Sequence, residues 1–184
     1  MTTDFSALDA ALLQEFPKFK VVLKQDSWLM RAISAFLLAV TFGKQHAFMT
    51  DFITTIGYTV YVPSTWPSMP QVAQMVILRH ERVHMRQRAK YSMALFTLLY
   101  VLLPLPGGLA YFRAKFEKEA YAETLRAIAD LYEDGLQQIQ SEACRADMVS
   151  NFTGPSYFWM WPFKKDINDW YDSVVLSIVM RLSK

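Results

Sequence analysis

Cysteine, histidine and net charge are all scarce in this chain of 184 residues. Its single cysteine, Cys144, excludes an internal disulfide and a cysteine-rich zinc site. The formal net charge is only +2, so the overall charge gives no reason to expect a nucleic-acid partner. No lysine or arginine occurs before Lys18, which argues against a cleaved secretory signal peptide. We therefore expect a cytoplasmic protein or a component of an assembled particle.

Long uninterrupted apolar runs are also missing, although 53% of the residues are hydrophobic. Residues 28–42 are largely apolar, with Arg31 as their one charged residue, but they are too few to cross a bilayer. Residues 92–112 are numerous enough, but two prolines and two glycines interrupt them. We predict that both segments form buried or surface-docked helices, and we leave peripheral membrane contact open.

The spacing of apolar residues predicts a mainly α (α+β) fold in one domain that covers residues 1–184. The β signal is confined to residues 53–62, where β-branched and aromatic residues surround one glycine and a proline follows. This segment predicts a strand or hairpin. The helices that we expect cover residues 4–16, 26–42, 70–103, 111–140 and 165–182.

The residues that indicate chemistry are His80-Glu81-Arg82-Val83-His84, an HExxH sequence within the expected helix 70–103. Positions i and i+4 lie on one face of a helix, so both imidazoles can reach the same Zn²⁺ ion. Glu81 lies about 100° further around the helix axis, where it can accept a proton from a zinc-bound water. The competing interpretation is a solvated basic helix, since arginines and a lysine flank both histidines. His46 lies outside any motif, and we expect it on a solvated loop.

A catalytic zinc site needs a third protein ligand, and no histidine follows His84. The ligand must then be a carboxylate. Glu117, Glu119 and Glu123 lie on the expected helix 111–140, which follows a PLPGG turn and can fold back antiparallel against the HExxH helix.

These two pieces of sequence resemble the gluzincin-type zinc peptidases, which pair an HExxH helix with a glutamate from a second helix. Glu117-Lys118-Glu119-Ala120-Tyr121 is similar to the Glu-x-x-Ala-(Asp or Asn) signature of that group, except at Tyr121. On this alignment Glu117 is the third ligand. A thermolysin-like Glu-x-x-x-Asp alignment selects Glu119 instead, so both remain candidates for the metal site.

The resemblance implies a zincin-like domain and a zinc metalloendopeptidase that acts on a peptide or protein substrate. It implies that a strand before the HExxH helix pairs with the extended substrate, and the alternative is a small structural hairpin. A tyrosine is the natural candidate to stabilise the negative oxygen of the transition state, and Tyr157 and Tyr121 are available. The competing interpretation is that each of them is an ordinary packing tyrosine. The alternative function is a structural or assembly protein on a peptidase-like fold that retains a zinc site.

Overall fold

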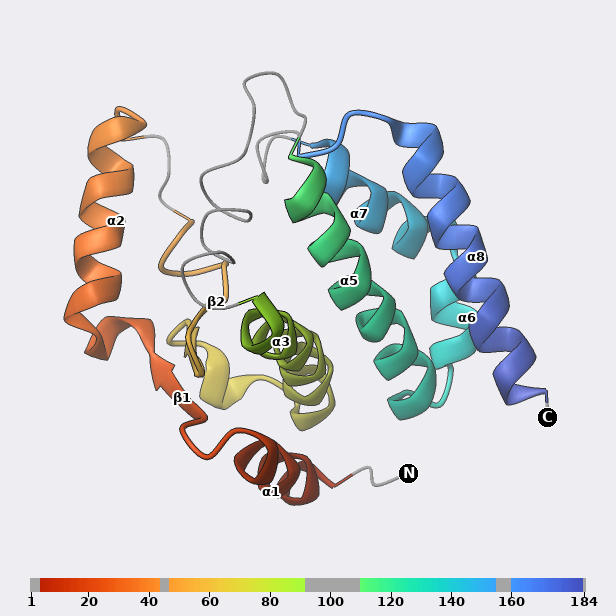
Figure 1. Cartoon of the computed structure of the whole chain (residues 1–184), viewed down its shortest axis with the longest axis horizontal. Helices are drawn as coiled ribbons and strands as arrows, with labels where there is room; N and C mark the ends of the chain where they lie inside the picture. Colours follow the sequence, from red (N-terminus) through yellow and green to blue (C-terminus); the bar gives the residue numbers. More distant parts are fainter. Residues whose placement is uncertain (1–3, 44–46, 92–109, 155–159, 184) are drawn as a thin grey trace. The chain divides into compact units, whose positions relative to one another are not determined.

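The computed structural model describes residues 4–43, 47–91, 110–154 and 160–183 and shows a mainly helical protein with one small sheet (Figure 1). This confirms the predicted fold class. The α-helices of the described residues are α1 (Phe5–Glu15), α2 (Trp28–Val40), α3 (Gln71–Tyr91), α5 (Tyr111–Leu131), α6 (Gly135–Gln140), α7 (Glu142–Thr153) and α8 (Lys164–Leu182).

Contacts along the chain divide it into two compact units, Thr2–Gln74 and Met75–Lys184. The boundary between them falls within α3, so all residues of the HExxH sequence belong to the second unit. The interpretation of residues 1–184 as one zincin-like domain stays a prediction.

The first unit contains a three-stranded sheet in the order β1-β3-β2. β1 (Lys20–Leu23) runs parallel to β3 (Thr59–Val62), whereas β2 (Thr54–Ile56) pairs with β3 in the antiparallel direction. β2 and β3 form a hairpin, one of the two forms expected for residues 53–62, and Gly57 adopts a φ of 69° in its turn. Sequence patterns missed β1, because its partner strand lies far along the chain. The expected pairing of this sheet with a substrate stays a prediction.

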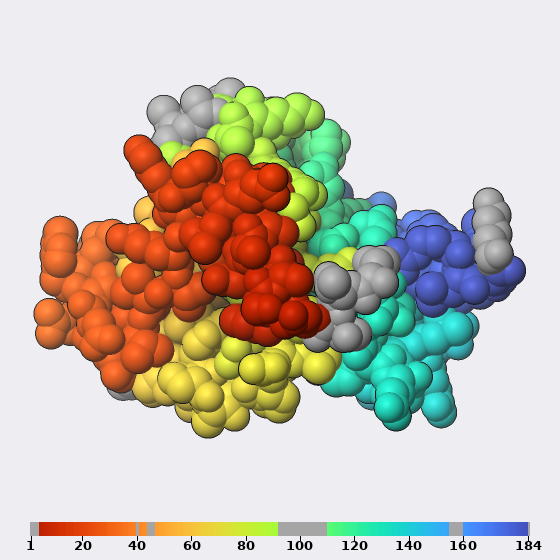
Figure 2. Space-filling model, turned by 90° about the horizontal axis from the view of Figure 1, so that it is seen from below, coloured from red at the N-terminus to blue at the C-terminus, as the bar shows by residue number. Residues whose placement is uncertain are grey.

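Side-chain caps fix where the helices of the first unit begin. The Asp4 carboxylate accepts a hydrogen bond from the Ser6 backbone N–H at 2.9 Å at the start of α1. The Ser27 hydroxyl accepts one from the Met30 N–H at the start of α2. Much of α1 lies at the surface on the face shown in Figure 2. The observed starts of α1 and α2 lie within about two residues of the predicted starts.

Two of the expected helices differ from the observed ones. α3 is described as far as Tyr91, and the remainder of the expected helix 70–103 lies outside the described residues. The expected helix 111–140 is divided into α5 and α6 by a break at residues 132–134. Gly135 begins α6, and a Cβ atom there would lie only 2.1 Å from the Ile128 carbonyl oxygen. The chain can make this close turn only because Gly135 has no side chain.

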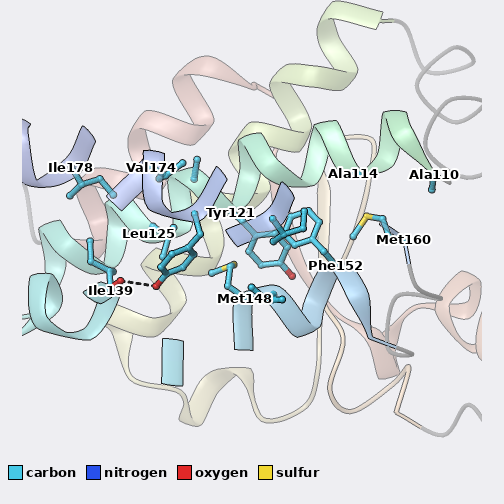
Figure 3. Close-up of a cluster of buried hydrophobic side chains, with 14 residues drawn as sticks. Ala110, Ala114, Tyr121, Leu125, Ile139, Met148, Phe152, Met160, Val174 and Ile178 are labelled. Carbon is cyan, nitrogen blue, oxygen red and sulfur yellow. Dashed lines mark hydrogen bonds between the residues drawn. The ribbon is translucent and has the colours of Figure 1, made fainter. Parts of the chain in front are cut away.

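The apolar core of the second unit lies where α5 meets α6, α7 and α8 (Figure 3). Tyr171 of α8 is buried in it, and its hydroxyl donates a hydrogen bond to the Ile139 carbonyl oxygen at 2.6 Å. This bond satisfies a polar group that would otherwise destabilise the core. The helical members of the cluster are Ala114, Tyr121, Ala122, Leu125, Ile139, Met148, Val149, Phe152, Ile167, Tyr171, Val174 and Ile178.

None of the helices in the described part of the chain has the length and apolar character needed to cross a membrane.

Candidate metal centre

The side chains that join α3 to α5 show that the two helices run antiparallel. Arg79, near the middle of α3, pairs with Glu123 at 2.6 Å and with Asp130 at 3.0 Å. One turn before the end of α3, Gln87 donates a hydrogen bond to Glu119 at 2.9 Å. Higher numbers on α3 therefore meet lower numbers on α5. This arrangement brings Glu117, in the first half of α5, level with the HExxH sequence.

Three side chains converge between these helices: His80 and His84 of α3, and Glu117 of α5. One ligand atom from each lies within 4.8 Å of the others. The two Nε2 atoms are 3.1 Å apart, and the Glu117 Oε2 atom lies 3.7 Å from each of them. Within the described residues, no other acidic, histidine or cysteine side chain joins this group.

The spacing of these atoms fits one metal ion. Ligand atoms at 2.0–2.1 Å from a tetrahedral ion are about 3.4 Å apart. The three observed separations bracket that value, so an ion would require only small movements of the side chains. Two imidazoles and one carboxylate are also a donor set that divalent transition metals prefer. His80, His84 and Glu117 are therefore placed to hold a metal ion.

The charges around the site act differently on the two histidines. Burial lowers the pKa of His80, and the neighbouring His84 lowers it further, against the opposing effect of Glu81 and Glu117. Burial would lower the pKa of His84 too, but the Glu117 and Glu81 carboxylates and hydrogen bonds to Glu117 and Gln87 raise it to about 9. A proton thus binds at His84 where a cation would bind, and a metal ion must displace it.

Each imidazole is held at its far nitrogen by a polar side chain. The Nδ1 atom of His84 lies 3.0 Å from the Oε1 atom of Gln87. The Nδ1 atom of His80 lies 2.9 Å from the Thr124 hydroxyl. Both contacts leave the Nε2 atoms directed towards Glu117. The sequence alone assigned no role to Thr124 or Gln87.

Glu81 is buried next to the two candidate ligands, with only 8% of its surface exposed. Its charge raises the pKa of both His80 and His84, so the carboxylate is near both rings without being one of the three converging ligands. This is the place that the HExxH spacing predicts for it.

The other acidic candidates on α5 have different partners. Glu119 is exposed, and its Oε2 atom accepts a hydrogen bond from Gln87. Glu123 pairs with Arg79 and Arg126. The structure thus brings Glu117 to the histidines, and it places Glu119 outside the group of converging ligand atoms.

The tyrosine candidates are only partly described. Tyr157 lies outside the described residues, as does His46. Tyr121 is 9% exposed, and its ring meets the His80 ring edge-on, with the centroids 4.9 Å apart. Tyr121 therefore borders the site, and its role as a hydrogen-bond donor stays a prediction.

A hollow on another side of α5 is separate from this centre. It has a volume of about 620 Å³ and is lined by residues of α5 and α8 and by Trp161. None of His80, His84 or Glu117 lines it. The candidate chemistry therefore does not lie in this hollow.

Comparisons of the chain with protein-family models, with curated proteins and with solved structures find no match.

Proposed function

We propose that this chain is a zinc-dependent peptidase of the gluzincin type, with Glu81 as its general base. The observation that carries the proposal is the convergence of His80, His84 and Glu117 within 4.8 Å, with Glu81 buried beside them. A metal site that served only to hold the fold together would not need a carboxylate directly after the first histidine.

The number of protein ligands supports a catalytic rather than a structural ion. Structural zinc sites are closed by four protein ligands, whereas catalytic sites use three and keep a position for water or substrate. The described residues offer three converging ligand atoms. The His80 side chain is 15% exposed, so the cluster is not sealed from solvent.

The cation and Glu81 would have different roles in the proposed reaction. A bound divalent cation supplies Lewis acidity, which lowers the pKa of water and polarises a carbonyl group. Glu81 takes a proton from the attacking water and delivers it to the amide nitrogen as the peptide bond breaks. His80, His84 and Glu117 hold the cation and do not exchange protons during this cycle.

The test is the Glu81→Gln variant, assayed on a library of unstructured peptides and analysed for metal content beside the wild-type protein. We expect the variant to keep its zinc and to lose hydrolysis by at least about 100-fold, since the amide cannot act as a base. If Glu81→Gln cleaved peptides as fast as the wild type, the mechanism would be wrong.

Metal analysis of the wild-type protein tests the choice of zinc. Two histidines and one carboxylate also bind Fe²⁺ in some oxygenases, so the protein should be purified anaerobically and analysed for both metals. Zinc at one equivalent with peptide hydrolysis supports the proposal. Zinc at one equivalent without hydrolysis by the wild type would favour an assembly role, and iron would contradict the proposed cofactor.

A further inference from the structure

The Gln87 side chain has only one allowed orientation. It is buried one helical turn after His84, and its Nε2 group donates to the Phe116 carbonyl oxygen at 3.0 Å and to the Glu119 Oε2 atom at 2.9 Å. Both hydrogens of the amide are therefore used. A flipped amide would turn its carbonyl oxygen towards these two acceptor oxygens, with no hydrogen between them. Phe116 and Glu119 thus fix which end of the amide faces His84.

The fixed amide determines where His84 carries its proton. The Gln87 Oε1 atom lies 3.0 Å from the His84 Nδ1 atom, and an amide oxygen can only accept a hydrogen bond. The hydrogen must then be on Nδ1. When the imidazole is neutral, its lone pair is on Nε2, the nitrogen that faces Glu117 and His80.

We propose that Gln87 is a positioning residue, which holds His84 in the tautomer that binds a metal through Nε2, and that Glu119 acts on the metal only through Gln87. The inference rests on the proposed metal site. It gives Glu119 an indirect role in place of the ligand role that one alignment suggests.

Thr124, which contacts His80, does not select a tautomer of that histidine. The Thr124 hydroxyl lies 2.9 Å from the His80 Nδ1 atom and 3.3 Å from the Ala120 carbonyl oxygen. A hydroxyl both donates and accepts, and it rotates freely, so it suits either tautomer of His80. Gln87 therefore selects the Nδ1–H tautomer of His84. Thr124 is compatible with that tautomer of His80 but does not select it.

The chain offers a matched control on the same helix. Gln74 is a buried glutamine of α3, and its amide donates to the backbone oxygens of Trp66 and Met69. Gln74→Met removes a similar set of hydrogen bonds as Gln87→Met. It touches neither His84 nor Glu119.

The experiment measures zinc affinity by chelator competition and the histidine tautomers by long-range ¹H–¹⁵N spectra of the full chain. We expect Gln87→Met to raise the Kd for zinc by about 10–100-fold and to remove the preference of the neutral, metal-free His84 ring for Nδ1–H. Gln74→Met should leave the Kd within about threefold, because it changes no partner of the metal ligands. Equal losses in the two variants would show a merely structural effect and overturn the proposal.

Two further measurements keep the proposal falsifiable if Gln87→Met does not fold. His84 of the zinc-bound wild type must show Nδ1–H, and a hydrogen on Nε2 would overturn the assignment. Glu119→Gln should raise the Kd for zinc less than Gln87→Met does, because its amide oxygen can still accept a hydrogen bond from Gln87. A loss as large as that of Glu117→Gln would show that Glu119 is itself a ligand.

These readouts separate this inference from the proposed function. Zinc binding with the expected tautomer but without peptide hydrolysis would overturn only the peptidase proposal. A wild-type protein that bound no divalent cation would overturn both.

Discussion

Two faces of α5 contact other helices, and they have opposite chemical character. The face towards α3 carries Glu117, Glu123, Thr124 and Asp130, and each of these contacts a charged or polar side chain of α3. The face towards α6, α7 and α8 carries alanines and Leu125 within the apolar cluster. One helix thus separates a polar interface from an apolar one.

This contrast shows how the protein can bury a charged centre and remain folded. Burial of charged groups is unfavourable unless each has a partner, so the α3–α5 interface adds little net stability. The apolar cluster contributes about 25 cal/mol for each Å² of apolar surface that it removes from water. We infer that the apolar face supplies stability, whereas the polar face supplies the site.

The largest expected effect is on the apolar face. Leu125 is fully buried, directly after Thr124 in the sequence. Leu125→Ala should reduce the free energy of unfolding by about 3–4 kcal/mol, because it removes apolar contacts and leaves a cavity. Urea denaturation of the metal-free protein measures this loss. Zinc affinity of the folded variant should be unchanged, and a strong loss of affinity would break the distinction between the two faces.

The next effect is a pH dependence that arises only on the polar face. The folded metal-free protein holds a proton on His84 up to a pKa of about 9, whereas the unfolded chain releases it near 6.5. The free energy of unfolding should therefore fall as pH rises from 6.5 to 9, by about 3 kcal/mol. His80 acts in the opposite direction below 6.5, because its lowered pKa leaves the folded state uncharged while the unfolded chain gains a proton.

Stability of the metal-free protein should thus be greatest near pH 6.5. Urea denaturation with a chelator present, from about pH 5 to about pH 10, measures this profile. Glu117→Gln should flatten the part above 6.5, because it removes a carboxylate that raises the pKa of His84. An equally steep decline in that variant would contradict the assignment of the proton to this site.

The smallest expected effect concerns the ligand itself. Glu117→Gln should raise the Kd for zinc by about 100-fold, which corresponds to about 2.7 kcal/mol, since a neutral amide is a weak zinc ligand. Chelator competition at pH 7 measures the change. Glu123→Gln is the matched control on α5, because Glu123 pairs with arginines and not with the histidines. If the control lost zinc equally, overall charge rather than coordination would explain the effect.

Helical periodicity made part of the site predictable. The i, i+4 spacing of His80 and His84 placed both rings on one face of a helix, and Glu81 followed from the same geometry. The third ligand remained open between Glu117 and Glu119, because the sequence does not show which face of the second helix meets α3. Two residues along a helix correspond to a rotation of about 200°, so only one of them can point at the histidines.

The sequence alone determined the mainly helical class, the hairpin before α3 and the pair of histidines, because each depends on neighbours within a few residues. Only the tertiary structure decided that β1 joins the sheet, that Glu117 meets the histidines, that Thr124 holds the His80 ring, and that Phe116 and Glu119 fix the amide of Gln87. These features join residues that are far apart in the chain. Such contacts form only when helices and strands pack, and packing depends on the whole chain rather than on any local pattern.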